Sequence, residues 1–244
     1  MITVSIVSHN QFSIALQTIK SFHAISNSAF FYIITINTAE KISEKLLKSI
    51  VGKNYKLIIN RDQIGFGENH NNASKEALGN IFIICNPDIE INSFDIENFI
   101  KKASTFDLIA PRVCLPSKSS YIYDFRSFPA LHRVFLRQCL RIINRMDHDI
   151  KEYEGKHSWF PGYFMAIDIN VFNKLGGFDT NFFMYCEDVD LCLRLKKGGY
   201  KIDKSDDILV SHIGQFSSNK KFRYFYMHLV SIIKLNLKML KGYY

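Results

Sequence analysis

The chain contains 244 residues, of which 47% are hydrophobic, 14% aromatic and 22% charged. This length suits one large domain with a substantial core, and the composition excludes a disordered or low-complexity chain. No apolar run approaches the roughly 18–20 residues that cross a bilayer, and the first residues lack the basic stretch and cleavage site of a secretory signal. We therefore expect a soluble cytoplasmic protein.

Charge and cysteine usage narrow the classes of partner and site. The 31 Lys and Arg residues exceed the 23 Asp and Glu residues, which gives a formal net charge of +8. Such an excess indicates an anionic partner: nucleic acid, a nucleotide, a phosphate or an acidic lipid. The 5 cysteines are scattered and form no CxxC pair. Their spacing favours reduced thiols over a disulfide framework or a zinc site.

Strand and helix patterns alternate through the first 110 residues. Short runs of apolar and β-branched residues predict strands at 3–8, 31–36, 55–60, 81–85 and 108–111. Amphipathic runs predict a first helix capped by Ser13 and further helices at 44–51, 68–78 and 94–104. This alternation predicts an α/β fold with a mostly parallel sheet and helices on both faces.

Sheets of this kind bind ligands at the carboxyl ends of their strands. Polar residues follow three of the predicted strands, at 8–10, 36–37 and 86–88. Pro87 ends the most apolar strand and leaves Asp88 at the carboxyl edge. A single carboxylate there suits a divalent cation that bridges a diphosphate, and the alternative is a turn aspartate that caps the next helix. His212 follows another predicted strand, where it is either structural or a second ligand beside Asp88.

Gly65 and Gly67 begin a pattern that resembles a dinucleotide fingerprint. His70 stands where the third glycine belongs, which disfavours a Rossmann dehydrogenase. The glycines either allow the backbone to approach a nucleotide closely or form an ordinary strand-to-helix turn.

The densest acidic cluster, Glu187, Asp188 and Asp190, lies between an aromatic run and a predicted helix around 191–195. Acidic residues are favourable in a first helical turn, and Asp190 can pair with Arg194 four residues later. These effects leave the other two carboxylates less well explained. A carboxylate in a partly apolar pocket has a raised pKa and suits a general base.

Two segments have the pattern of basic amphipathic helices. The first carries Arg133, Arg137, Arg141 and Arg145, and the second carries Lys234, Lys238 and Lys241 beside Ile233, Leu237 and Leu240. They are either solvated helix faces or surfaces that dock on anionic headgroups, to which each basic residue contributes about 1 kcal/mol. The occurrence of two such helices favours docking.

Several motifs occur in the order of a known family over most of residues 1–215. They lie at 7–10, 65–67 with Asn71, 86–89, 162–165, 176–179 and 183–195. With these motifs the sequence resembles the inverting glycosyltransferases of family 2, which have the GT-A fold. It is especially similar to bacterial rhamnosyltransferases of O-antigen (lipopolysaccharide) and cell-wall synthesis.

The resemblance implies a role for each matching residue. Asp88 corresponds to the last aspartate of the motif that holds Mg²⁺ or Mn²⁺, and His212 to a late histidine that completes the metal site. Asp188 corresponds to the catalytic base that deprotonates the acceptor hydroxyl. The implied donor-binding residues are Ser8, Asn10, Asn37, Asp62, Gly65, Asn71 and Asn86, and the implied acceptor-binding residues are Trp159, Gly162 and Glu187.

Two positions depart from the family pattern. Ile36 replaces an aspartate that usually contacts the base or ribose, so recognition of the base is looser or shifts to Asp62. The metal motif begins with Asn86 and Pro87, which leaves a single aspartate and makes metal dependence less certain. The asparagine variant is typical of the rhamnosyl branch.

The resemblance also implies an organisation and a function. We expect a GT-A domain at 1–215, with a nucleotide-binding half at 1–112 and an acceptor half at 113–215, followed by a basic helical tail at 216–244. The favoured function is transfer of L-rhamnose from dTDP-rhamnose to a lipid-linked saccharide, by a peripheral protein on the inner face of the cytoplasmic membrane. The alternatives are a UDP-hexose donor or a non-catalytic nucleotide-sugar-binding scaffold. Nucleic acid is disfavoured because no recognition motif accompanies the charge, and the oligomeric state stays open.

Overall fold

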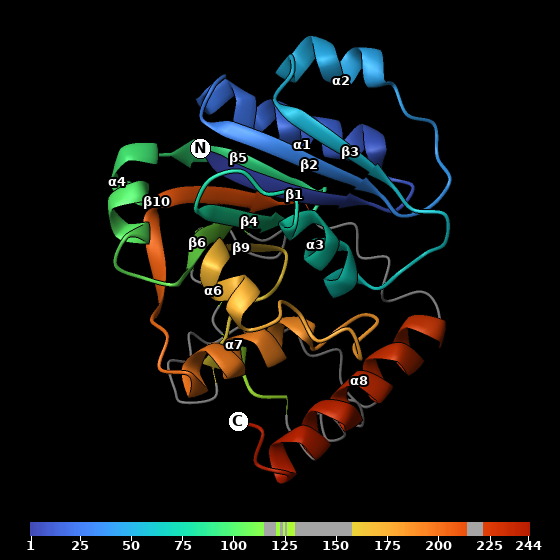
Figure 1. The fold of residues 1–244 in the computed structure, drawn as a ribbon, viewed down its shortest axis with the longest axis vertical. Coiled ribbons are helices and arrows are strands. Elements are labelled where there is room, and N and C mark those ends of the chain that lie inside the picture. Colours follow the sequence, from blue (N-terminus) through green and yellow to red (C-terminus); the bar gives the residue numbers. More distant parts are fainter. Residues whose placement is uncertain (115–120, 123, 125, 130–157, 214–221) are drawn as a thin grey trace.

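The computed structural model describes residues 1–114, 121, 122, 124, 126–129, 158–213 and 222–244. An eight-stranded sheet in the order β3-β2-β1-β4-β9-β6-β10-β5 runs through the molecule, with helices on both faces (Figure 1). Its strands are β1 (Ile2–Ser8), β2 (Phe30–Ile36), β3 (Tyr55–Ile59), β4 (Ile81–Cys85), β5 (Ile89–Phe94), β6 (Leu108–Cys114), β9 (Phe164–Asp168) and β10 (Ile202–His212). A separate two-stranded sheet pairs β7 (Arg126–Ser127) with β8 (Ser158–Trp159).

The helices are α1 (Phe12–Ile25), α2 (Glu44–Val51), α3 (Phe66–Ser74), α4 (Ile96–Ala103), α6 (Ile169–Lys174), α7 (Glu187–Lys197) and α8 (Phe222–Leu240). In Figure 1, α1 and α2 cover one face of the sheet, and α3, α6 and α7 lie on the other. None of the helices in the described ranges is both long enough and apolar enough to span a membrane.

The α/β fold is confirmed, and its sheet is mixed. The four strands β3, β2, β1 and β4 are parallel. Strand β9 is antiparallel to both β4 and β6, and β5 is antiparallel to β10. The sequence reading missed β5 and β9, which are the two strands that run against their neighbours.

Two hydrophobic clusters pack against the two faces of the sheet. Phe22 of α1 is fully buried in the first, where its ring lies 5.1 Å from that of Phe30. Phe172 of α6 and Leu191 of α7 are fully buried in the second. Burial of an aromatic or leucine side chain contributes roughly 1.5–3 kcal/mol, so both layers fix the strand ends at which polar residues gather.

The helix cap expected at Ser13 is wrong, and so is the alternative that Asp88 caps a helix. Ser13 does not cap α1, which begins one residue earlier; the backbone N–H of Phe12 donates instead to Glu40 Oε2 at 2.8 Å. The distant carboxylate satisfies a helix-end donor that local sequence could not assign. Asp88 caps no helix either, because strand β5 follows it and Asp95 caps α4.

Helix α8 forms as expected, and it packs on α7. Ile232 and Leu235 are buried against Phe182 and Val189 in a third hydrophobic cluster. The lysines of the helix do not form one solvated stripe, because Lys238 pairs with two carboxylates of the protein and is largely covered. The arginine-rich segment from Arg133 to Arg145 lies outside the described residues.

Candidate active site

The donor edge, as we name the carboxyl ends of β1, β2 and β4, is built from amides that hold neighbouring backbone. The Asn37 side chain donates to Ile64 O at 2.9 Å and accepts from Ile64 N–H at 3.0 Å and from Asn60 Nδ2 at 2.9 Å. These bonds fix the loop before α3. Asn37 is 5% exposed, so it positions this loop, and its contact with a nucleoside stays a prediction.

Ser8 is fully buried at the same edge. Its hydroxyl donates to Glu40 Oε1 at 2.5 Å and accepts from the Gln11 N–H at 3.1 Å. Both hydrogen-bonding roles of the hydroxyl are therefore used within the chain. This arrangement gives Ser8 a structural role at the start of α1.

Gly65 and Asn71 join the donor edge to the loop before α7. The Phe66 N–H donates to Phe183 O at 2.9 Å, and a Cβ on Gly65 would lie 2.8 Å from that same oxygen. The Asn71 amide accepts from the Phe178 N–H and donates to Phe178 O, both at 2.8 Å. Gly65 and Asn71, both predicted to bind the donor, therefore lie against segments more than 100 positions away in the sequence.

Three predicted donor residues lie nearer to solvent. Asn10 and Asp62 are exposed, and Asn86 is half-buried. Asn10 has a φ of 60°, a left-handed conformation that asparagine tolerates. Ile36, which replaces the family aspartate, is 1% exposed and belongs to the core. The exposed side chain of Asp62 leaves it accessible to a nucleoside, and its role in place of the family aspartate stays a prediction.

Asp88 and His212 come together as predicted. His212 Nε2 lies 3.4 Å from Asp88 Oδ1, and Asp88 is 7% exposed. The turn is fixed from three sides, because Thr18 Oγ1 donates to Pro87 O, Asn86 N–H to Tyr163 O and Ile213 N–H to Asp88 O. A carboxylate and an imidazole suit Mg²⁺ or Mn²⁺ when substrate oxygens and waters fill the other positions. Within the described ranges, no group of three or more His, Cys, Asp or Glu side chains is arranged so that it could hold a metal ion.

Asp188 is held at the start of α7 by two backbone donors. Its Oδ2 accepts from the Gly162 N–H at 2.9 Å, and its Oδ1 accepts from the Val189 N–H at 2.8 Å. A Cβ on Gly162 would lie 3.3 Å from Asp188 Cβ and 3.4 Å from the Phe66 ring, so the close approach favours glycine. Burial raises the pKa of Asp188, and the two N–H bonds and the Arg126 charge oppose that rise. A raised pKa is the property expected of a general base.

Glu187 adds a second buried carboxyl to this turn. It is 6% exposed, and its Oε2 has no hydrogen-bond partner among the residues that the structure describes. Burial first, and the Asp188 charge second, raise the pKa of Glu187 well above its ordinary value. Two adjacent carboxyls cannot both ionise freely here, so Glu187 holds a proton more readily than an exposed glutamate does.

The sequence reading missed Asp124 and Arg126. Arg126 donates Nε to Asp124 Oδ1 at 2.9 Å and Nη2 to Oδ2 at 2.7 Å, while the Tyr163 hydroxyl donates to Oδ2 at 3.0 Å. The guanidinium also lies 5.5 Å from the centre of the Trp159 ring. No local motif marks these residues, and only their meeting with Tyr163 and Trp159 reveals them.

Residues Gly162 and Tyr163 connect the two carboxylate centres. Gly162 donates its N–H to Asp188, and Tyr163 accepts from the Asn86 N–H at 2.8 Å beside Asp88. The Tyr163 ring also lies 4.6 Å from the His212 ring. One short segment therefore positions both the candidate base and the candidate metal ligands.

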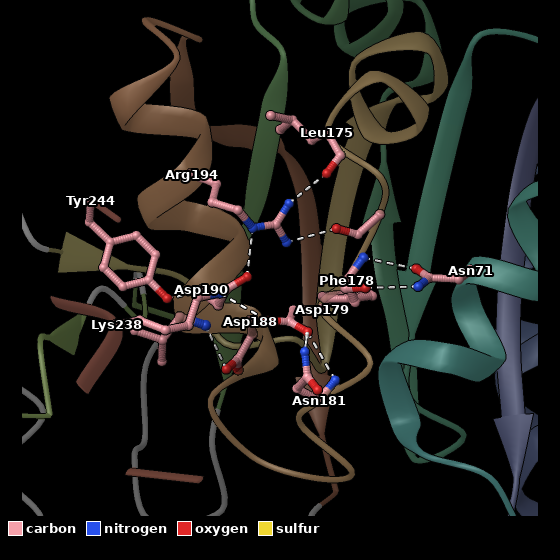
Figure 2. A network of polar contacts seen from close by, with 12 residues as sticks. Asn71, Leu175, Phe178, Asp179, Asn181, Asp188, Asp190, Arg194, Lys238 and Tyr244 are labelled. Atoms are coloured by element: carbon pink, nitrogen blue, oxygen red, sulfur yellow. Dashed lines mark hydrogen bonds and ion pairs between the residues drawn. The ribbon is translucent and has the colours of Figure 1, made fainter. Parts of the chain in front are cut away.

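A polar network around Asp190 connects α7 to other segments of the chain (Figure 2). Fully buried Asp190 pairs with Arg194 at 2.6 Å, as predicted, and also contacts Lys238 and the Tyr244 hydroxyl. Arg194 donates to Leu175 O at 2.9 Å and to Gly177 O at 2.7 Å. Lys238 pairs with Asp179 at 2.9 Å as well. The network therefore joins the loop that contacts Asn71, the helix that carries Asp188 and the last residues of the chain.

Comparison by sequence finds two rhamnosyltransferases. Rhamnosyltransferase WbbL of Escherichia coli is 27% identical over 213 residues, which cover 83% of this chain and 79% of that protein. The N-acetylglucosaminyl-diphospho-decaprenol L-rhamnosyltransferase of Mycobacterium tuberculosis is 27% identical over 168 residues, or 64% of this chain. The aligned part spans about half (54%) of the mycobacterial relative. No family model matches the chain.

Comparison by structure finds glycosyltransferases. GalNAc-T7, solved with UDP, GalNAc and Mn²⁺, has a TM-score of 0.66 at 17% identity over 88% of this chain and 44% of that one. The mannosyltransferase PcManGT of Pyrobaculum calidifontis, solved with GDP-Man and Mn²⁺, has a TM-score of 0.61 at 14% identity over 97% of this chain and 64% of that one. These likenesses show that the fold is GT-A.

Proposed function

We propose that this chain, a GT-A glycosyltransferase of the family 2 rhamnosyltransferase-like type, transfers L-rhamnose from dTDP-rhamnose to a lipid-linked saccharide with inversion. The names of both rhamnosyltransferase relatives support rhamnose as the transferred sugar, and the name of the mycobacterial relative supports an acceptor with a diphospho-polyprenol. We further propose that the reaction takes place at the inner face of the cytoplasmic membrane.

The observation that carries this proposal is the bridge made by Gly162 and Tyr163. Inversion needs a base on one side of the anomeric carbon and a stabilised leaving group on the other. The bridge fixes Asp188 for the first task and supports Asp88 and His212 for the second. Asp188 then takes the proton of the acceptor hydroxyl while the hydroxyl oxygen attacks the anomeric carbon in line. The nucleoside diphosphate leaves from the opposite side of that carbon.

Asp88 and His212 are the residues that would hold the metal, and Mn²⁺ in the two structural neighbours supports a divalent ion. When bound, the ion supplies charge stabilisation to the departing diphosphate. The choice between Mg²⁺ and Mn²⁺ belongs to the experiment below.

The acceptor side is formed by Trp159, Gly162 and Glu187 in this proposal. The half-buried Trp159 ring, with Arg126 against it, offers a flat surface to a sugar. A protonated Glu187 can donate a hydrogen bond to an acceptor oxygen. Burial raises the pKa of Asp188, and the Arg126 charge opposes that rise, which favours the ionised form that accepts the proton.

Isothermal titration with dTDP and UDP, each with Mg²⁺, Mn²⁺ or EDTA, tests the donor assignment. We expect dTDP to bind only with a metal, and the Asp88→Asn variant to bind it at least tenfold more weakly. Asp206→Asn is the matched control, since its carboxyl is 71% exposed. A preference for UDP would select the UDP-hexose alternative, whereas binding of neither nucleotide would contradict both donor assignments.

A further inference from the structure

The outer face of α8 carries a row of exposed apolar side chains. We call this row the outer stripe: Tyr226, Leu229, Ile233, Leu237 and Leu240, with exposures of 61%, 38%, 40%, 50% and 83%. Their spacing of three, four, four and three residues puts them on one side of the helix. Single exposed leucines are ordinary on a protein surface, but a continuous row of this length indicates an interaction site.

The opposite side of α8 fixes the direction of the outer stripe. Ile232 and Leu235 are at most 1% exposed, and Ser231 Oγ donates to Met184 O at 2.8 Å. Lys238 is held by Asp179 and Asp190 on that inner side. The helix therefore cannot turn the outer stripe inward without breaking these contacts.

Charge along the end of the chain favours an anionic occupant. Residues 208–244 contain six Lys and Arg and no Asp or Glu. Lys234 and Lys241 are exposed on α8 and just beyond it. Tyr226 begins the outer stripe, and Tyr243, 58% exposed, follows its end. Tyrosine and lysine beside an apolar row are typical of helices that lie in the headgroup region of a membrane.

We propose that the outer stripe is a membrane-docking surface that seats α8 on anionic lipid headgroups, parallel to the bilayer. The apolar side chains enter the boundary of the acyl chains, and the lysines meet the phosphates. A second copy of the chain fits less well, because it would bring together two basic helices that have no carboxylate. The lysine stripe expected from sequence is thereby replaced by an apolar stripe flanked by lysines.

Vesicle co-sedimentation of the full chain, without donor or acceptor, tests this surface. The vesicles contain phosphatidylcholine alone or with phosphatidylglycerol. We expect the double variant Ile233→Ser, Leu237→Ser to lower the partition coefficient onto the anionic vesicles at least tenfold. The matched control, Leu46→Ser with Ile100→Ser, removes side chains of similar exposure (43% and 47%) from α2 and α4 and should change binding less than twofold.

Several outcomes decide the matter. Binding that falls as NaCl rises, and that is at least fivefold weaker on neutral vesicles, supports docking on anionic lipid. Unchanged binding of the α8 double variant overturns the proposal. Light scattering without vesicles tests whether a second copy of the chain occupies the outer stripe instead. A wild-type dimer that the double variant converts to monomer would assign the outer stripe to that second copy and overturn the proposal. The result does not depend on nucleotide binding, so failure here and failure of the proposed function are distinguishable.

Discussion

The donor edge and the turn before α7 are stabilised by different forces. At the donor edge, the neutral amides of Asn37 and Asn71 bind backbone groups. At the turn, Glu187, Asp188 and Asp190 crowd together, and their charge is offset by Arg194 of the same helix and by Arg126 and Lys238 from distant segments. Hydrogen bonds between neutral groups do not titrate, whereas buried carboxyls do. The contrast predicts that the contacts of Asn37 and Asn71 respond less to pH than the acidic turn does.

The backbone of the turn differs as well. Tyr185 and Cys186 have φ values of 70° and 68°, a conformation that is uncommon for such residues. Strained backbone persists only where surrounding contacts hold it. Here α8 supplies contacts to both residues: the Tyr185 ring lies 4.8 Å from the His228 ring, and Cys186 is buried in one hydrophobic cluster with Ile232 and Leu235. The acidic turn therefore depends on α8.

The largest expected effect comes from removing the candidate base. Asp188→Asn keeps the shape of the side chain but cannot take a proton, so kcat should fall by roughly 10²–10⁴-fold. Affinity for dTDP should stay within a few-fold, because Asp188 is not among the residues proposed to bind the nucleotide or the metal. Turnover of dTDP-rhamnose and titration of dTDP measure the two quantities. Asp206→Asn should leave both unchanged, and a variant of Asp188 that retains wild-type turnover would exclude it as the base.

Local pattern was enough for the part of the fold that frames the donor edge. Helix α2 and strand β4 have the bounds expected from sequence, because a capped amphipathic run and a continuous apolar run are local signals. Strands β5 and β9 were missed because a parallel βα pattern gives no sign of an inserted antiparallel strand. Helix α3 begins at Phe66 rather than at residue 68. The N–H of Phe66, the first in the helix, donates to the Phe183 carbonyl.

The candidate site divides in the same way. Asp88 and His212 could be predicted as neighbours, since both follow strands of one sheet. Asp124 and Arg126 could not, since their meeting with Tyr163 depends on tertiary packing. Asn71 was assigned to the donor, but both atoms of its amide hold Phe178. Sequence identified residues that matter here without distinguishing contact with a ligand from positioning of the backbone.

A smaller effect, on stability, sharpens the comparison. Asp190→Asn leaves Arg194 and Lys238 without their shared carboxylate, and removing one partner of a buried ion pair costs about 3–5 kcal/mol. Asn71→Ala removes two hydrogen bonds to Phe178 and should cost about 1–3 kcal/mol. Urea denaturation at neutral pH measures both free energies of unfolding. Equal losses of unfolding free energy in the two variants would contradict the inference that charge stabilises the turn more than it stabilises the donor edge.

The smallest effect concerns pH and has opposite signs at two neighbouring carboxyls. Burial raises the pKa of Glu187, so the folded state binds this proton more tightly than the unfolded state, and stability falls as pH rises above the ordinary value of about 4.3. Glu187→Gln removes this loss of stability. As pH rises above that value, the free energy of unfolding of the variant should therefore increase relative to wild type by up to about 1.4 kcal/mol per pH unit.

Asp179 provides the opposite case for the same measurement. Burial opposes ionisation there, but the hydrogen bonds from Lys238 and Asn181 and the charge of Lys238 together outweigh it and lower the pKa of the carboxyl. Its stabilising effect is present above the ordinary pKa and is lost as pH falls through the lowered value. Asp179→Asn should therefore be destabilising near neutral pH and approach wild type in acid. The free energy of unfolding of each variant, relative to wild type, is measured between pH 3 and 8. If the two differences changed with pH in the same direction, the assignment of Glu187 as a buried acid and Asp179 as a paired carboxylate would be refuted.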